Sequence, residues 1–390
     1  MKFHRRTADA LYRVSFGAFA YAAYAALYPN SLLVHKWHIK CICHRLEEMS
    51  RRLETERSGK LATRAVSKDL VINLPPRSLK SFLVSIAWVA WMLGRNPSLE
   101  IICASYSEDL SHKFSRDCRA LMESRFYKRV FRTRINPRKS TETEFETTKR
   151  GFRLATSIGA TVTGRGADIF IIDDPTKSND ASSEVALEAA NVWFRSTALS
   201  RRNNPAKTLM LVVQQRLHTN DLSGTLIELG WSSLVMPAIA TEPQDYPIAD
   251  DEVYHRPAEE LLQPDWDSCE ELERIKIEIG SRNFAAQYQQ NPTPPEGNLI
   301  KVSWLARYQL CPPRQKFHRV VLSCDPAGKA NIKNDYTAIT VVGVDKRESY
   351  LLQVSRGHWN VLEMRDRKKR LPPNGKQHSS SWKIRRVEWG

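Results

Sequence analysis

The sequence predicts an α/β fold in which helices flank a parallel β-sheet, and three observations support this prediction. Between residues 69 and 213, short runs of aliphatic and β-branched residues alternate with segments of helical length. The runs are apolar throughout rather than alternating with polar residues, which is typical of strands buried on both faces. Parallel strands require long crossover connections, and the intervening segments are long enough to be crossover helices.

The expected elements follow one another along the chain. Residues 1–60 are predicted to be helical. Strands are expected at residues 70–74, 101–105, 168–174 and 208–213, and helices near residues 80–93, 107–124 and 184–200. These elements assign residues 61–245 to the α/β domain. Prolines then become frequent, so residues 246–316 are interpreted as a linker with one helix near residues 267–290.

A second group of strands is expected after the linker. The segments HRVVLSCDPAG, YTAITVVGVD and SYLLQVSRG have two-residue periodicity and short polar connections, which predict a β-meander. Residues 317–360 are therefore interpreted as the start of a second, incomplete domain. Residues 361–390 are basic and without pattern, and we interpret them as an aberrant tail.

The charge balance indicates a polyanionic partner. The chain has 59 Lys and Arg residues against 43 Asp and Glu residues, for a net charge of +16. Such a surplus favours nucleic acid, because neutralising phosphates releases counterions.

Cysteine usage and hydropathy indicate the compartment. Seven cysteines without a regular framework indicate a reducing, cytoplasmic environment. Cys41, Cys43 and His44 lack the partners that would complete a zinc site, so buried, inert thiols are expected there. The apolar run Phe16–Tyr28 is shorter than the roughly 20 residues of a membrane span, so we expect a packed helix and no membrane association.

The segment PPRSLKS, residues 75–81, connects the first expected strand to its helix. A phosphate-binding loop at this place needs backbone N–H groups, a lysine for the phosphates and a hydroxyl for Mg²⁺. Lys80 and Ser81 match the last two positions of a P-loop, whereas Leu74 and Leu79 stand where that pattern has glycine. The same string also fits a strand end followed by a proline turn and a capped helix.

The segment IFIIDDP, residues 169–175, reads as a buried strand that ends in two carboxylates. Nucleotide hydrolysis needs one acid in the Mg²⁺ shell, here Asp173, and one that polarises the attacking water, here Asp174. An Asp pair before proline is also common in turns. The loop and this strand, in this order on one α/β domain, predict a nucleotide hydrolase that binds ATP and Mg²⁺.

Several segments resemble the corresponding segments of phage terminase large subunits, in the order of that family: INLPPRSLKS, IICASYSEDL, TGRGADIFIIDDP, QQRLHTNDLSG, FAAQYQQNPTPPEGN and SCDPAGKANIKNDYTAITVVG. The resemblance extends from about Trp37 to about Arg367. It implies a P-loop ATPase domain, a linker and an RNase H-like nuclease domain in an ATP-driven DNA-packaging motor. It also implies double-stranded DNA, a small terminase subunit and a portal protein as partners, a homo-oligomeric ring, and a phage- or prophage-encoded protein in the bacterial cytoplasm.

The resemblance assigns roles at the nucleotide. Residues Arg77, Ser78, Leu79, Lys80 and Ser81 form the nucleotide-binding loop, with Lys80 on the β- and γ-phosphates and Ser81 on Mg²⁺. Asp173 and Asp174 form the metal-binding and water-polarising pair, although the family often has Glu where Asp174 stands.

Further roles lie outside the loop. Arg165 would act in trans as an arginine finger, or it would have a structural role at its Gly-rich turn. Gln214 and Gln215 would couple hydrolysis to movement. For Trp37 and His38 two interpretations stay open, namely contact with adenine and packing in the core.

In the second domain, Asp325 stands where the family has its first nuclease metal ligand, and Asp335 is either a supporting acid or a strand cap. Two-metal cleavage needs further carboxylates from a later strand and a helix. We expect the nuclease to be lost through truncation or a frameshift. Read one base out of step from about Lys369, permitted codons give TAAAKWQAAFVIVEDTSSGMG, in which an apolar run ends in Glu-Asp.

Two other functions are compatible with parts of the pattern. A helicase-like nucleic-acid ATPase would share the loop and the Asp pair, but it would not need the strands around Asp325. An inactive prophage relic would at most bind DNA.

Overall fold

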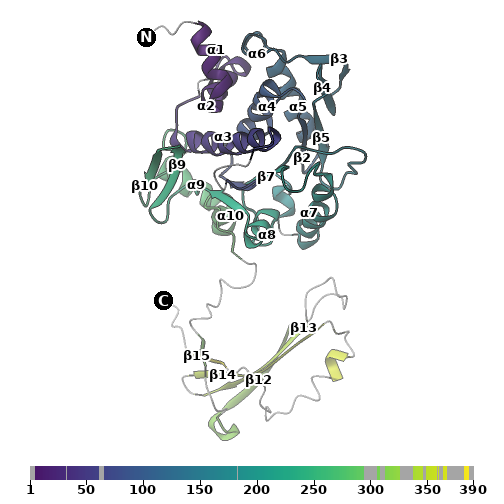
Figure 1. Cartoon of the computed structure of the whole chain (residues 1–390). Helices are drawn as coiled ribbons and strands as arrows, with labels where there is room; N and C mark the ends of the chain where they lie inside the picture. The colour runs from purple at the N-terminus through teal and green to yellow at the C-terminus, as the bar shows by residue number, and fades with distance from the viewer. Residues whose placement is uncertain are drawn as a thin grey trace. The chain divides into compact units, whose positions relative to one another are not determined.

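The computed structural model describes most of the chain, and it forms two compact units, Met1–Pro294 and Pro295–Gly390. The described residues are 5–31, 33–60, 66–181, 183–293, 305–307, 312–325, 337–345, 348–357, 359, 363–366 and 382–385. Figure 1 shows the elements of both units, and each unit is described by itself below.

An eight-stranded sheet organises the first unit, with the strand order β3-β4-β5-β2-β6-β7-β1-β8. Its strands are β1 (Asp69–Asn73), β2 (Glu100–Ser105), β3 (Ile135–Ser140), β4 (Glu144–Thr147), β5 (Phe152–Ser157), β6 (Ile169–Asp173), β7 (Leu209–Gln214) and β8 (Ser232–Val235). The strands from β5 to β8 in this order are parallel, and β4 and β3 continue the sheet antiparallel. The predicted α/β fold is therefore confirmed.

The four predicted strands are β1, β2, β6 and β7, which lie side by side in the sheet and are buried along nearly their whole length. The predicted helices correspond to η1 (Phe82–Trp88) continued by α4 (Val89–Arg95), to α5 (Glu108–Glu123) and to α7 (Glu184–Ser196). The helix that follows β1 begins with η1, which is π-helical, and continues as the α-helix α4.

Helices cover both faces of the sheet (Figure 1). Because side chains alternate along a strand, Ile72 and Ile171 face the core formed with α3, η1 and α5, where α3 spans Trp37–Arg57. Val71 and Ile172 face the opposite core, which is closed by α7 and α8 (Leu222–Glu228).

The N-terminal region is helical as predicted, and its described residues form α1 (Arg5–Val14), α2 (Phe16–Leu27) and α3. Phe16 and Phe19 of α2 are fully buried in the first core, so the apolar run is a packed helix. Among the described residues, no helix combines the length and the apolar character needed to cross a membrane. Cys41 and Cys43 of α3 are buried, and burial raises the pKa of the Cys41 thiol to about 12.

The segment expected as a linker contains folded elements, and it belongs to the first unit as far as Pro294. It contains the hairpin of β9 (Gln244–Ala249) and β10 (Glu252–Arg256), then α9 (Cys269–Ile279) and α10 (Ser281–Gln287). Two helices replace the single one predicted, because Gly280 separates them with a φ of 82°, outside the helical range.

The second unit contains an antiparallel sheet in the order β11-β15-β14-β13-β12. Its strands are β11 (Leu305–Arg307), β12 (Arg319–Asp325), β13 (Thr337–Val344), β14 (Glu348–Gly357) and β15 (Trp382–Arg385). The predicted meander β12-β13-β14 is confirmed. The sheet has five strands rather than the three predicted, and one of the additional strands, β15, lies in the expected tail. The two additional strands, β11 and β15, were not predicted because strands of three and four residues are too short to show a two-residue period.

Candidate nucleotide-binding site

The predicted loop and the predicted Asp pair meet at the carboxyl-terminal edge of the parallel strands. The loop follows β1, and the Asp pair ends β6, with only β7 between these two strands. Lys80 Nζ lies 3.9 Å from Asp174 Oδ1, and Ser81 Oγ donates a hydrogen bond of 3.0 Å to Asp173 Oδ1. The structure thus brings together two pairs of neighbouring side chains, and the two pairs are more than ninety residues apart in the sequence.

The loop backbone adopts left-handed conformations without glycine. Arg77 has a φ of 60° and Leu79 a φ of 62°, and the buried Ser78 donates a hydrogen bond of 2.7 Å to the carbonyl of Pro75. Each non-glycine residue in this region costs on the order of 1 kcal/mol or more. Left-handed residues within tight turns are typical of backbone nests that bind anions. Leu79 therefore has a conformation suited to glycine at the position where the P-loop pattern has glycine.

Asp173 is a buried carboxylate held by two hydroxyls. It is 1% exposed and accepts hydrogen bonds from Ser81 at 3.0 Å and from Ser85 at 2.5 Å. Burial raises its pKa to about 7, and the charge of Asp174 adds to this rise, whereas the hydrogen bond from Ser85 and the charge of Lys80 oppose it. Hydroxyl and carboxylate oxygens are the ligands that Mg²⁺ prefers, so Ser81 and Asp173 fit a magnesium site.

The raised pKa of Asp173 predicts a pH-dependent stability in the absence of divalent cations. In the folded chain the Asp173 carboxyl keeps its proton up to about pH 7, whereas an aspartate side chain in an unfolded chain has a pKa of 3.8. Between these values the folded state binds more protons than the unfolded state, so the contribution of Asp173 to the free energy of unfolding falls as the pH rises. Denaturant titrations with EDTA from about pH 5 to about pH 7 should show this slope, and Asp173→Asn should remove it. An identical slope in the variant would assign the pH dependence to other groups.

Asp174 combines a fixed backbone with an accessible side chain. Its N–H donates to the Val213 carbonyl at 2.8 Å, and its carbonyl accepts from the Tyr106 N–H at 3.0 Å. Its φ is 49°, a left-handed conformation that surrounding contacts must maintain. The side chain is 26% exposed, so its carboxylate can reach water while the buried Asp173 cannot.

A cavity of about 480 Å³ opens beside the loop. Its lining includes the basic side chains Lys36, Lys80 and Lys113 and the aromatic side chains Tyr24 and Phe82. The Tyr24 and Phe82 rings lie edge to face at 5.2 Å. A cavity beside the loop that is lined by both cations and aromatic rings fits a ligand that has phosphates and a flat ring.

Trp37 and His38 do not line this cavity. Trp37 stacks on Tyr254 with 4.6 Å between ring centroids, and its Nε1 donates to Glu260 at 3.2 Å. His38 is 1% exposed, and burial lowers its pKa to about 3. Their geometry agrees with the packing interpretation rather than with contact to adenine.

Arg165 lies at the other end of the sheet order from the loop. It forms an ion pair of 2.5 Å with Glu144 of β4, and its guanidinium lies 5.0 Å from the centre of the Phe152 ring of β5. In the described part of the chain it contacts these two residues rather than the loop or the Asp pair. A role in trans stays a prediction.

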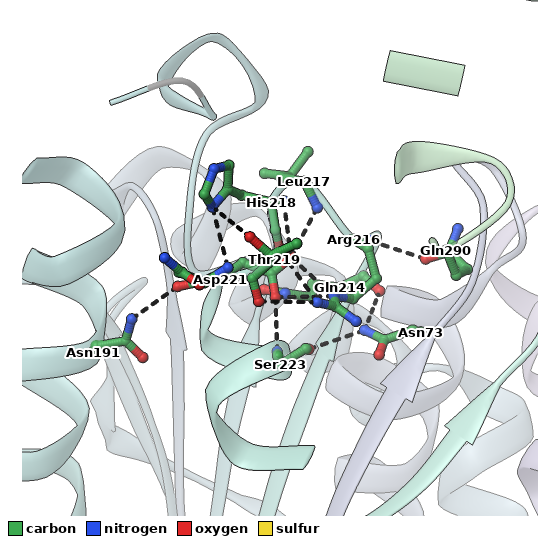
Figure 2. A network of polar contacts seen from close by, with 12 residues as sticks. Asn73, Asn191, Gln214, Arg216, Leu217, His218, Thr219, Asp221, Ser223 and Gln290 are labelled. Atoms are coloured by element: carbon green, nitrogen blue, oxygen red, sulfur yellow. Dashed lines mark hydrogen bonds and ion pairs between the residues drawn. The ribbon is translucent and has the colours of Figure 1, made fainter. Parts of the chain in front are cut away.

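Gln214, the first of the two predicted coupling residues, lies in a polar network at the end of β7, which Figure 2 shows from close by. Gln214 is buried, and its carbonyl accepts a 3.1 Å hydrogen bond from the Asn73 side chain at the end of β1. Asn73 also donates to Ser223 of α8 at 3.0 Å. Gln215 donates at 3.0 Å to Ser178, which follows the Asp pair. The end of β7 is thus connected to the ends of both site strands.

Asp221 is the centre of this network (Figure 2). It is fully buried, caps α8 through the Gly224 N–H at 2.8 Å, and accepts from Leu217 N–H at 2.9 Å. Both of its oxygens accept from Arg216 Nε at 3.0 Å. The arginine also donates to the carbonyls of His218 and Thr219, so its charge is held among buried acceptors.

Removing this carboxylate should strongly destabilise the first unit. Asp221→Ala leaves the Arg216 guanidinium without its charge partner and the helix without its cap, with an expected loss of about 3–5 kcal/mol in the free energy of unfolding. Chemical denaturation measures it. Asp245→Ala removes an exposed acid paired with His255 and serves as the control, with an expected loss below about 1 kcal/mol. Equal losses of stability in both variants would contradict the proposed contribution of the Asp221 network to the free energy of unfolding.

One further group of side chains has metal-ligating chemistry. His44 and Glu48 of α3 and Asp250 have ligand atoms within 4.8 Å of one another. The two carboxylates are already paired with cations, however, because Arg45 lies 2.9 Å from Glu48 and Arg51 lies 2.8 Å from Asp250. These arginines disfavour a further cation at this place.

The nuclease residues lie in the second unit. Asp325 is exposed at the end of β12, opposite Ala338 of β13. Asp335 lies outside the described residues. The acids Asp345 and Glu348 lie at the other end of the meander, where Arg319 pairs with Val344, so among the described strands no second carboxylate lies beside Asp325.

In fold, the chain is similar to phage large terminases. The large terminase of bacteriophage HK97 matches with a TM-score of 0.44 at 12% identity, covering 92% of this chain and 71% of that protein. One from a thermophilic bacteriophage matches with a TM-score of 0.38 at 10% identity, covering 83% and 73%. The ATPase domain of the Thermus phage P74-26 large terminase matches with a TM-score of 0.37 at 13% identity, covering 61% and 97%. No family model and no curated protein sequence matches the chain.

Sequence reasoning missed several residues of the site. Ser85 had a usable signal, since it is a lone polar residue within the apolar helix segment FLVSIAW. Asn73 had a similar one, because it directly follows the apolar residues Leu70–Ile72 of its strand. Tyr24 and Tyr28 of the cavity had none, because they come from α2 and its C-terminal end, and no local pattern connects that helix to the loop.

Proposed function

We propose that the chain is an ATPase of the terminase large-subunit type, which hydrolyses ATP to move duplex DNA. The observation that carries the proposal is the convergence of Lys80 and Ser81 with Asp173 and Asp174 at the carboxyl-terminal edge of a parallel sheet. The cavity beside them is of nucleotide size. The terminase type comes from the sequence segments that resemble that family.

Each of these residues has a distinct role in hydrolysis. Lys80 binds the β- and γ-phosphates with its ammonium group, and the loop N–H groups from Arg77 to Ser81 bind phosphate oxygens. Ser81 and Asp173 would hold Mg²⁺, and this ion would supply positive charge against the phosphates. Asp174 accepts a hydrogen bond from the attacking water and orients it toward the γ-phosphate.

Two further roles extend beyond the phosphates. Gln214 and Gln215 transmit the state of the site, because they connect the end of β7 to Asn73 and to Ser178. Arg165 acts on the site of a neighbouring subunit, for which its Glu144 ion pair must open. A packaging ring on a portal protein, with a small terminase subunit and in the host cytoplasm, completes the proposal.

The direct test is ATP hydrolysis by the purified 390-residue chain. Phosphate release should require Mg²⁺ and should increase when duplex DNA is added. A chain that is folded by circular dichroism but neither binds nor hydrolyses ATP would support the inactive relic instead. Hydrolysis that is stimulated only by single strands would favour a helicase-like ATPase.

We further propose that this 390-residue polypeptide has lost the nuclease activity of its relatives. Two-metal cleavage needs several carboxylates around ions about 4 Å apart, and on the described strands Asp325 is the only acid at its end of the meander. Two further acids, Glu363 and Asp366, lie in a short described helix whose Met364 Sδ is 3.4 Å from Cys324 Sγ. No cleavage of duplex DNA is expected with Mg²⁺ or Mn²⁺ in an agarose-gel assay. Cleavage that is lost in Asp325→Ala would contradict the proposal and would mean that acids from elsewhere complete the site.

A further inference from the structure

An exposed basic surface lies at the edge of the first unit, away from the candidate nucleotide site. Residues 125–140 contain seven Lys and Arg residues and no Asp or Glu. They form α6 (Arg125–Val130), a short connection and β3, the edge strand of the sheet. All seven cations are exposed, namely Arg125, Lys128, Arg129, Arg132, Arg134, Arg138 and Lys139. We call this the α6–β3 surface.

Helix α1 extends the surface. Arg13 Nη1 donates to the Val130 carbonyl at the end of α6, at 2.9 Å, and Arg6 and Arg13 are both exposed. Figure 1 shows α1, α6 and β3 in the same part of the first unit. Asp9 of α1 is paired with Arg129 at 2.9 Å.

Some of these cations have structural partners, and others have none within the described residues. Lys139 pairs with Glu146 at 2.7 Å, and Arg134 donates to the carbonyls of Phe131, Thr133 and Lys128. With Arg129 paired to Asp9, three of the seven cations have partners. In the part of the chain that the structure describes, the side chains of the other four form no ion pair or hydrogen bond, and these are Arg125, Lys128, Arg132 and Arg138. Four unneutralised cations on a short stretch repel one another, and a bound polyanion would relieve that repulsion.

Protection of a sheet edge does not account for the whole surface. Lys, Arg and Pro on an edge strand prevent pairing with another chain, and β3 has Pro137, Arg138 and Lys139. Three of the seven cations belong to α6 and two to the connection, however, where no strand edge needs protection. The cations therefore extend well beyond the edge.

We propose that the α6–β3 surface binds the phosphate backbone of a nucleic-acid duplex. The surface is rich in arginine, whose planar guanidinium matches phosphate geometry. Single strands are also held by base stacking on exposed aromatics, but the aromatics of this segment are buried or half-buried, namely Phe126, Tyr127 and Phe131. Backbone contacts without base contacts imply binding without sequence preference.

This proposal rests on the proposed duplex partner and gives it a place on the chain. The test is the salt dependence of duplex binding, measured by fluorescence anisotropy between about 50 and about 200 mM salt. One variant replaces four unpartnered cations by glutamine: Arg125→Gln, Lys128→Gln, Arg132→Gln and Arg138→Gln. The control removes the same charge elsewhere on the first unit: Lys60→Gln, Lys207→Gln, Arg274→Gln and Arg282→Gln.

The expected result is a change in slope for the first variant alone. Each phosphate contact contributes about −0.9 to the slope of log K against log salt, so losing four contacts makes the slope shallower by about 3.6. Over that fourfold range of salt, the affinity of the variant should fall about 10²-fold less than that of the parent. The control should keep the slope of the parent. Equal changes in both variants, or no change in either, would overturn the proposal.

Two further measurements separate the possible failures. Hydrolysis of ATP without DNA should be equal in the parent and in both variants, so its absence in the parent would reject the ATPase and not the surface. In the parent chain, bound duplex should protect Lys128 and Lys139 from acetylation, with Lys207 unprotected. Acetylation of Lys128 that is unaffected by duplex would contradict the assignment. Binding of anionic vesicles or single strands as tightly as duplex would contradict it too. Both measurements use the parent chain, so they apply even if the variant fails to fold.

Discussion

Replacing Lys80 by alanine is expected to abolish ATP hydrolysis, with a fall in kcat of about 10³-fold or more. The Lys80 side chain is 8% exposed, which places its charge in a low-dielectric surrounding, next to the candidate phosphate site. Removing it withdraws a fixed cation from the place where negative charge shifts during phosphoryl transfer. Nucleotide affinity should fall as well, because the same group binds the ground-state phosphates.

Phosphate release under saturating Mg²⁺ and ATP measures this effect. The matched control is Lys207→Ala, which removes an exposed ammonium group from the same unit. The control should have the rate of the parent and the same unfolding midpoint. A Lys80→Ala protein that hydrolyses ATP as fast as the control would remove the loop from the mechanism.

Asp174→Asn is expected to keep nucleotide binding and to lose turnover, with kcat reduced by about 10²- to 10⁴-fold. Asparagine preserves the size of the side chain, and the hydrogen bonds of residue 174 with Val213 and Tyr106 involve only its backbone. The amide cannot accept a proton from water, so the step that fails is activation of the nucleophile. Binding of a fluorescent ATP analogue and single-turnover hydrolysis separate the two effects.

Asp173→Asn provides the contrast, because this acid is assigned to the metal and not to water. Its loss should weaken the dependence of nucleotide binding on Mg²⁺, whereas Asp174→Asn should leave that dependence unchanged. Equal turnover in Asp174→Asn and the parent would assign the water-activating role to another residue. Loss of nucleotide binding in Asp174→Asn would instead give this acid a structural role.

The central part of the fold could be predicted because burial on both faces leaves a strong pattern. Runs such as IFIID and LMLVVQ are short, apolar and rich in aliphatic residues, which is typical of strands buried on both faces. The strand β3, with the sequence INPRKS, has no such pattern, because an edge strand that faces solvent tolerates proline and charge. The β9-β10 hairpin was not predicted for a similar reason, because its strands contain proline and charged residues and resemble a polar connection.

The candidate site was predictable where chemistry restricts the residue type, and not where it depends on conformation. Lys80, Ser81 and the Asp pair follow from the needs of phosphate and metal binding. The left-handed backbone at Leu79 does not, because leucine rarely adopts it and only tertiary contacts impose it. The buried pair of Arg216 and Asp221 is local in sequence, but its burial depends on α8 packing onto the sheet.

The last helical segment of the first unit ends at a fixed point beside the nucleotide edge. The Gln290 side chain accepts a 2.9 Å hydrogen bond from the Arg216 N–H, two residues after β7 (Figure 2). Gln289 holds Ile239 through two further hydrogen bonds, at 2.9 and 3.1 Å. The chain of the second unit begins at Pro295, five residues later. A displacement of the end of β7 would therefore move Gln290 with it, and with it the point at which the chain leaves the first unit.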